Sequence, residues 1–70
     1  MITEIINENN EKVQIIINNR YIGLGKCGMT DGYEIKGKLT EFYRHDYAII
    51  LDDKLGYPCS VYIHSLQELK

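Results

Sequence analysis

The sequence lacks a long apolar run, and no stretch approaches the roughly 20 residues that a membrane-spanning helix needs. It also lacks the basic start of a secretory signal, because its first ten residues, MITEIINENN, carry acidic Glu4 and neither Lys nor Arg. The sequence therefore predicts no membrane segment and a cytoplasmic location.

An excess of charge of one sign is also missing. The chain has eight Lys and Arg residues and ten Asp and Glu residues, which gives a net charge of −2 and a pI near 5.5. This balance supplies no overall electrostatic attraction to nucleic acid or to anionic lipid. The apolar content of 44% is ordinary for a folded chain, and 70 residues suffice for one small domain.

Cysteine is scarce, with only Cys27 and Cys59, which we expect to be free thiols. Together with His45 and His64 they could form a zinc set, but the close spacing that marks such sites is absent. Cys27 beside a histidine and Asp31 could be arranged for nucleophilic catalysis, yet chance places such residues in any domain. We therefore expect no metal, no cofactor and no enzymatic activity.

A phosphate-binding loop is not indicated either. Gly23, Gly25 and Gly28 are spaced as in glycine-rich loops, but the segment leads into a predicted strand. Phosphate loops place the anion at a helix N-terminus, and the sequence predicts no helix there.

Isoleucine is abundant, with eleven residues, and it favours β structure because its restricted side chain packs well on a pleated surface. Alternation of apolar and polar residues predicts strands at 12–18, 34–43 and 58–64, and the highly apolar run YAIILD predicts another at 47–52. Cys59, Val61 and Ile63 are expected to face inward in the last of these.

The segments between the strands carry turn signals. Residues 19–33 contain four glycines and are expected to form a long loop. Residues 1–10 are expected to form a flexible or loosely docked N-terminal arm. Residues 52–56 predict a tight hairpin with Gly56 in the left-handed region, and residues 65–70 predict one helical or 3-10 turn.

Gly37 is the unusual residue of the second predicted strand. Ile35, Gly37 and Leu39 share one face, so the glycine points toward the core and not into a loop. A glycine inside a strand marks a bulge, a sharp bend or a close approach of another backbone. We therefore expect the strand to bend sharply at Gly37.

The long loop, the bent strand, the short hairpins and the 3-10 turn before a last strand resemble the SH3-like small barrel over residues 12–70. Gly37-Lys38-Leu39, followed by the apolar strand at 47–51, is similar to the KOW motif of ribosomal and transcription-elongation proteins. Those families are generally basic, and this chain is not. The signalling SH3 domains are a poorer match, because the chain lacks tryptophan and an ALYDY-like run.

The resemblance implies an all-β fold, a single five-stranded SH3-like barrel over residues 11–70 with a long first loop. Small SH3-like proteins also occur in bacterial prophages and plasmids, and the chain's length and Ile- and Asn-rich composition are compatible with that origin.

Tyrosine dominates the aromatic residues, with six tyrosines and one phenylalanine. Tyrosine offers a large contact area at low entropic cost and is enriched at binding surfaces, although any one tyrosine can equally cap a small core. We expect a partner protein to bind through the long loop and the turn at 43–47. The candidate residues are Tyr21, Tyr33, Tyr43, His45, Tyr47 and Tyr62.

A basic stripe is the basis of the alternative function. Arg20, Lys26, Lys36 and Lys38 lie near one another in the sequence and could contact phosphates, with exposed tyrosines as stacking platforms. This alternative predicts a KOW-like nucleic-acid-binding accessory protein. The net charge favours the protein-binding function over it.

Overall fold

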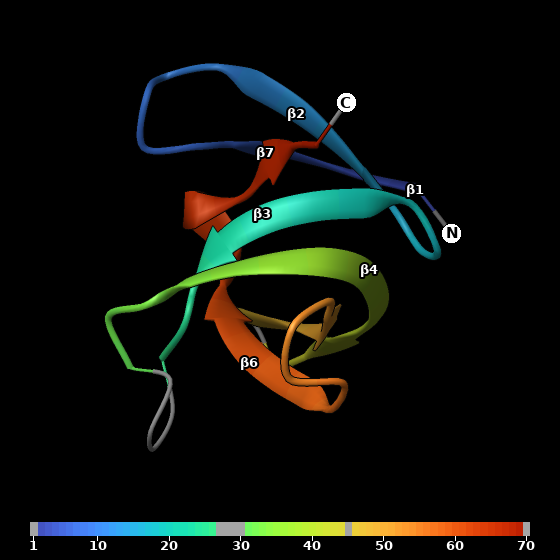
Figure 1. Ribbon diagram of the computed structural model, residues 1–70. Helices are drawn as coiled ribbons and strands as arrows, with labels where there is room; N and C mark the ends of the chain where they lie inside the picture. Colours follow the sequence, from blue (N-terminus) through green and yellow to red (C-terminus); the bar gives the residue numbers. More distant parts are fainter. Residues whose placement is uncertain (1, 27–30, 45, 70) are drawn as a thin grey trace.

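The computed structural model describes residues 2–26, 31–44 and 46–69, and within these ranges the chain is all-β (Figure 1). The strands are β1 (Ile2–Ile6), β2 (Lys12–Ile16), β3 (Arg20–Leu24), β4 (Glu34–Tyr43), β5 (Tyr47–Asp52), β6 (Pro58–Tyr62) and β7 (Gln67–Glu68), with a 3-10 turn, η2 (Ile63–Ser65), before β7. No helix in the described ranges is long and apolar enough to cross a membrane.

The strands form two antiparallel sheets. β1 and β2 make a hairpin, and the other five strands follow the order β6-β5-β4-β3-β7. Figure 1 shows the hairpin above β3 and β7, and the strongly curved β4 leading down toward β6. The strands predicted at 34–43 and 47–52 are confirmed, and the one predicted at 58–64 ends at Tyr62, where η2 begins.

The sheets are not closed into a barrel. In the part of the chain that the structure describes, one isolated bridge, between Gly25 and Val61, and one hydrogen bond, from the Lys26 N–H to the Ser60 carbonyl (3.0 Å), join the end of β3 to β6. A closed barrel needs a continuous ladder at this seam. The predicted five-stranded closed barrel is therefore replaced by a curved five-stranded sheet covered by a hairpin.

The predicted long loop over residues 19–33 is wrong, because β3 occupies its first part. β3 pairs with β4 along its whole length and with β7 through Tyr21 and Ile22. Gly23 is buried in this strand, and a Cβ there would lie 3.1 Å from both Val61 and Leu66 side-chain atoms. The glycine thus provides room for close packing, whereas the sequence suggested a loop.

The N-terminal arm is also corrected, because Ile2–Ile6 forms β1. All five of its residues pair with β2, and Ile5 packs against the core. Asn7 then organises the turn: its side-chain oxygen accepts hydrogen bonds from the Asn9 and Glu11 N–H groups, both at 3.0 Å. Asparagine turns of this kind explain why the NENN segment connects two strands.

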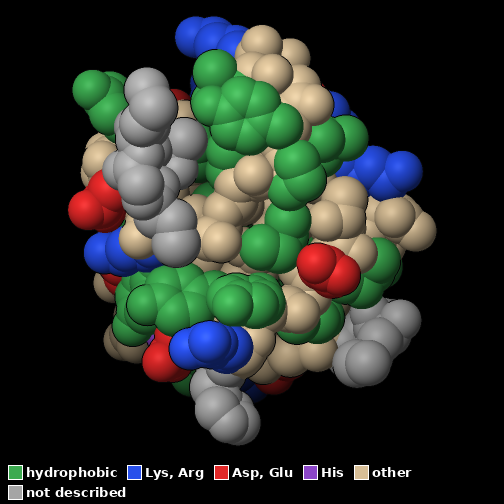
Figure 2. Space-filling view, turned by 90° about the horizontal axis from the view of Figure 1, so that it is seen from below, with side chains coloured by type: hydrophobic (Ala, Val, Ile, Leu, Met, Phe, Trp, Pro, Cys, Tyr) green, Lys and Arg blue, Asp and Glu red, His purple; other side chains and the backbone are tan. Residues whose placement is uncertain are grey.

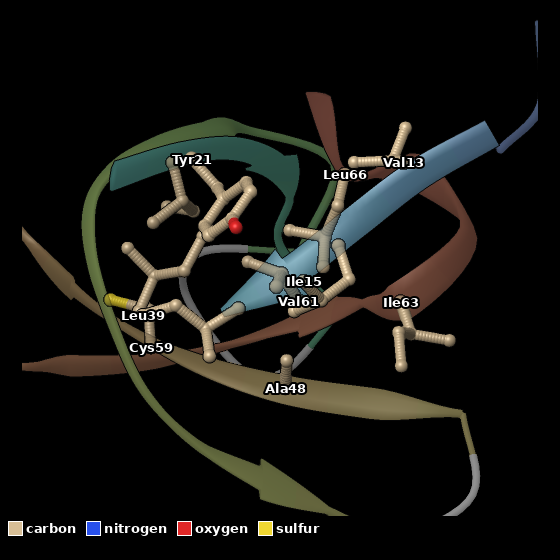
Figure 3. Packing of buried hydrophobic residues seen from close by; sticks show 11 residues of the cluster. Val13, Ile15, Tyr21, Leu39, Ala48, Cys59, Val61, Ile63 and Leu66 are labelled. Carbon is tan, nitrogen blue, oxygen red and sulfur yellow. The ribbon is translucent and has the colours of Figure 1, made fainter. Parts of the chain in front are cut away.

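The core lies between the hairpin and the curved sheet, with side chains from both (Figure 3). Val13 and Ile15 enter it from β2, and Cys59, Val61 and Ile63 enter it from the opposite side, as their alternation predicted. Tyr21 is its largest fully buried side chain. Its hydroxyl donates to the Gln14 carbonyl and accepts from the Ile16 N–H, both at 2.8 Å, which ties β2 to β3.

Gly37 faces the interior, as predicted, but the bulge lies elsewhere. The register between β4 and β5 shifts between Leu39 and Glu41, so the extra residue is Thr40. Gly37 is needed for a close backbone approach, because a Cβ there would lie 2.0 Å from the Leu51 carbonyl oxygen. Strands β4 and β5 could not keep this contact with a larger residue.

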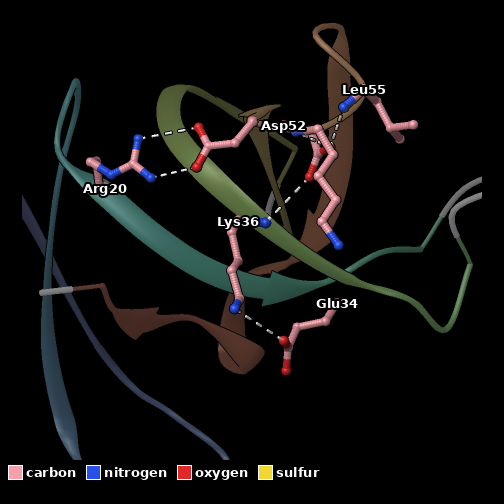
Figure 4. Close-up of polar contacts among 7 residues, drawn as sticks. Arg20, Glu34, Lys36, Asp52 and Leu55 are labelled. Atoms are coloured by element: carbon pink, nitrogen blue, oxygen red, sulfur yellow. Dashed lines mark hydrogen bonds and ion pairs between the residues drawn. The ribbon is translucent and has the colours of Figure 1, made fainter.

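The turn between β5 and β6 is built around Asp52. Its carboxylate accepts hydrogen bonds from the backbone N–H groups of Lys54 (3.0 Å) and Leu55 (2.7 Å) (Figure 4). Gly56 has φ +74°, which confirms the predicted left-handed residue, and its N–H donates to the Asp52 carbonyl at 2.9 Å.

Candidate functional site

Three tyrosines form a row across the outer surface of β4, β5 and β6. Tyr43 lies directly opposite Tyr47, and Tyr47 lies directly opposite Tyr62. Directly opposed residues of antiparallel strands point to the same face, with Cβ atoms about 5 Å apart. The three side chains therefore lie next to one another in one row on the same face.

The bulge at Thr40 is the reason that Tyr43 joins this row. Before the bulge, Leu39 is buried, and unbroken alternation would turn Tyr43 toward the core. The extra residue reverses the alternation, so that Phe42 packs against the core and Tyr43 is 46% exposed. A bulge that redirects a side chain outward is a common feature of functional surfaces.

Apolar residues extend the row along β5 and β6. Ile49 and Leu51 follow Tyr47 on the same side of β5, and Pro58 lies opposite Leu51. Leu51 is 40% exposed, although it is a large aliphatic residue. We name these six residues the tyrosine face: Tyr43, Tyr47, Ile49, Leu51, Pro58 and Tyr62. Figure 2, which views the molecule from this side, shows hydrophobic side chains gathered in a band across it.

A cation lies at each end of the tyrosine row. Lys26 Nζ is 5.6 Å from the ring centroid of Tyr62, and Arg44 Cζ is 5.3 Å from that of Tyr43. Both distances are within the range of cation–π attraction. His64 makes an edge contact with Tyr62, with ring centroids 5.3 Å apart. Among the described residues, no carboxylate forms an ion pair with Lys26 or Arg44.

The outer face of β3 and β4 carries the rest of the predicted basic stripe. Arg20 lies opposite Lys38, and Ile22 lies opposite Lys36. Carboxylates accompany two of these cations: Arg20 is held by two hydrogen bonds to Asp53, and Lys36 Nζ is 3.8 Å from Glu34 (Figure 4). We name Arg20 and Lys36 with these two carboxylates the ion-paired face. Lys38 has no carboxylate partner among the described residues, and it lies opposite Leu51 of the tyrosine face.

The ion pair shifts the titration of both partners. Hydrogen bonding to Asp53 raises the pKa of Arg20, and hydrogen bonding to Arg20 lowers the pKa of the Asp53 carboxyl. The arginine charge is thus directed at a carboxylate of the same chain. The predicted stripe is divided, because Lys26 contacts Tyr62 on the other surface.

The predicted partner-binding residues separate into groups. Tyr43, Tyr47 and Tyr62 come together, as described above. Tyr33 is 68% exposed but lines a separate hollow with Glu34, Lys36 and residues 52–54. Tyr21 is 1% exposed and leaves no surface for a partner, so it is a core residue and not a contact residue. His45 lies outside the described residues.

Sequence reasoning missed Ile49, Leu51 and Arg44 as members of this surface. The apolar run at 47–52 predicted a strand but not its exposed side, because Tyr47, Ile49 and Leu51 alternate with the equally apolar Ala48 and Ile50. The structure buries Ala48 and Ile50 and leaves Leu51 exposed. The available signal was the apolar run itself, because a small antiparallel sheet usually has one face in water and such a run must then expose some apolar side chains.

The cysteines do not contribute to this surface. Cys59 is buried, as predicted, and burial, with a smaller contribution from the Asp52 charge, raises the pKa of its thiol. A thiol with a raised pKa is a poor nucleophile near neutral pH. Cys27 lies outside the described residues, and within those that are described no three His, Cys, Asp or Glu side chains cluster as metal ligands would.

Comparison of the chain with protein-family models, with curated proteins and with solved structures gives no match.

Proposed function

We propose that the protein is a non-enzymatic interaction module that binds a partner protein through the tyrosine face. The observation that carries the proposal is the unbroken row of Tyr43, Tyr47 and Tyr62 on an outward surface, continued by Ile49 and Leu51. Exposed apolar groups that are neighbours on one face, as opposed to scattered ones, mark interaction sites. Tyrosine in particular is enriched in the desolvated centres of protein interfaces.

The charge distribution supports a protein partner over nucleic acid. Lys36 and Arg20 are paired with carboxylates, and the net charge of the chain is −2. Contacts to phosphate require cations that can replace condensed counterions. The ion-paired face therefore supports phosphate binding less well than the sequence suggested.

Single-stranded nucleic acid is the second candidate. The observation that favours it is the placement of Lys26 and Arg44 over two tyrosine rings, since stacking platforms with nearby cations bind unpaired bases. This function would use the tyrosine face itself, with Lys38 beside it opposite Leu51, whereas Lys36 is paired with Glu34.

We also propose that the fold is related to the SH3-like barrels. A curved β4 between β3 and β5, the 3-10 turn before β7 and the bridge between Gly25 and Val61 support a relationship to SH3-like barrels, with the seam left open. The hairpin of β1 and β2 then covers the open side.

Capture of partners by matched tyrosine variants tests the proposal. The chain is immobilised and exposed to a nuclease-treated extract of its own host, and bound proteins are quantified by mass spectrometry. Tyr43→Ala should weaken capture of the partner by about 30-fold or more, the effect of truncating a hot-spot residue. Tyr33→Ala, an equally conservative change at an exposed tyrosine outside the face, should leave capture unchanged. Equal capture by the wild type and Tyr43→Ala would contradict the proposal.

A further inference from the structure

The charges around the tyrosine face point to one class of partner segment. The row from Tyr43 to Tyr62 crosses two strand spacings, about 10 Å in all. Arg44 contacts the first ring of the row and Lys26 contacts the last, whereas Tyr47 between them contacts neither cation. The surface therefore has an uncharged aromatic centre with one positive charge at each end.

These two cations differ from Arg20 and Lys36 in their surroundings. Arg20 and Lys36 have carboxylate partners, and among the described residues Lys26 and Arg44 have none. A cation over an aromatic ring keeps its charge, because the ring polarises toward it without neutralising it. Both cations thus remain able to attract a negative group on a bound molecule.

We propose that the tyrosine face binds an extended peptide of a partner protein, with a short apolar centre and acidic residues on both sides of it. This inference rests on the proposed function and specifies its ligand. An extended chain rises about 3.3 Å per residue, so about three apolar residues cover the row and place the next side chains near Lys26 and Arg44. Carboxylates there form charge-assisted contacts with both cations.

The same pattern disfavours a nucleic-acid strand as the occupant. Each nucleotide of a strand stacked along the row carries a phosphate, so negative charge would lie over the centre as well as the ends. Among the described residues no cation lies over the ring of Tyr47, and Glu41 lies opposite Ile49 beside the row. Lys38 lies farther along the face, opposite Leu51. Proteins that bind single strands track the backbone with continuous positive charge, which this surface lacks.

A titration with designed peptides tests the inference. The probe is a capped peptide of three leucines flanked on each side by three glutamates, and its matched control carries lysines in place of the glutamates. Binding is followed by the amide signals of the isotope-labelled chain. The glutamate peptide should bind about fivefold more tightly or better, since two exposed ion pairs replace two repulsions, and it should shift the signals of Tyr43, Tyr47 and Tyr62. High salt should reduce the preference.

Charge reversal then identifies the cations responsible. The double variant Lys26→Glu with Arg44→Glu should prefer the lysine peptide. Lys12→Glu with Lys36→Glu changes the net charge equally, outside the face, and should keep the preference for glutamate. A merely structural role of Lys26 and Arg44 would not reverse the selectivity.

Three results would overturn the inference: no binding of the glutamate peptide, equal binding of both peptides, or tighter binding of a single-stranded oligothymidine than of the glutamate peptide. The capture experiment with Tyr43→Ala tests the proposed function independently of these results. Failure of the peptide inference can therefore be distinguished from failure of the proposed function.

Discussion

Two surfaces of this small protein share strand β4 and use charge in opposite ways. On the ion-paired face, Arg20 and Lys36 contact Asp53 and Glu34. On the tyrosine face, Lys26 and Arg44 contact aromatic rings. The first arrangement satisfies its charges within the chain, whereas the second leaves positive charge beside exposed apolar area.

The boundary between the two surfaces is the bulge at Thr40. Before it, Lys36 and Lys38 point outward, with Lys38 between Arg20 of β3 and Leu51 of β5, and after it Glu41 and Tyr43 point outward opposite Ile49 and Tyr47. A single extra residue thus reverses the alternation of β4 and changes the kind of side chain that the strand presents to solvent. Lys36 and Tyr43, seven residues apart on the same strand, therefore belong to surfaces of different character.

The largest expected effect is on the stability of the strands that carry both surfaces. Gly37→Val should lower the free energy of unfolding by about 3 kcal/mol or more, because its Cβ would meet the Leu51 carbonyl, which is backbone and cannot rotate away. Lys38→Ala, at the adjacent exposed position, should change it by less than about 0.5 kcal/mol. Urea denaturation measures both. Equal midpoints for the two variants would show that β4 and β5 do not approach as closely as described.

A smaller effect distinguishes the buried tyrosine from the exposed ones. Tyr21→Phe should destabilise by about 1–2 kcal/mol, because it leaves the Ile16 N–H and the Gln14 carbonyl without the hydroxyl that bonds both. The matched change Tyr43→Phe removes a hydroxyl from an exposed ring and should leave stability unchanged. If the two changes cost the same in chemical denaturation, Tyr21 does not connect β2 to β3.

The smallest effect concerns the ion-paired face alone. Arg20→Ala should reduce stability only slightly and less still in high salt, because the pair is exposed. Since the folded-state pKa of Asp53 lies below its ordinary value of 3.8, the pair contributes above that value and its contribution is lost as pH falls through the folded-state pKa. The free energy of unfolding should therefore differ between the wild type and Arg20→Ala above pH 3.8, and the difference should disappear as the pH falls through the folded-state pKa of Asp53. A difference that grows at lower pH would contradict the pairing.

The sequence predicted strands where apolar and polar residues alternate and where a short apolar run occurs. The segments at 34–43 and 47–52, the inward side of β6 and the left-handed Gly56 are confirmed. It failed at β3, because Gly23 was interpreted as a loop residue when it packs against Val61 and Leu66. It also missed β1, whose five residues are too few for a reliable pattern without the partner strand β2.

The tyrosine face could be predicted only in part. Composition pointed to tyrosine, and three of the six candidate residues lie in the row. Their alignment depends on the register of three strands and on the bulge, and neither is visible in residue types alone. For the same reason the four predicted basic residues could not be divided between two surfaces before the pairing of the strands was known.

The central claim is that the tyrosine face, and not the ion-paired face with its neighbour Tyr33, contacts the partner. Hydroxyl-radical footprinting of the chain, free and in the complex captured from nuclease-treated extract, measures this with the tyrosines as built-in reporters. We expect protection of Tyr43, Tyr47 and Tyr62 in the complex, while Tyr33 is oxidised as readily as in the free chain. Protection of Tyr33 with continued oxidation of Tyr43 and Tyr62 would contradict the account.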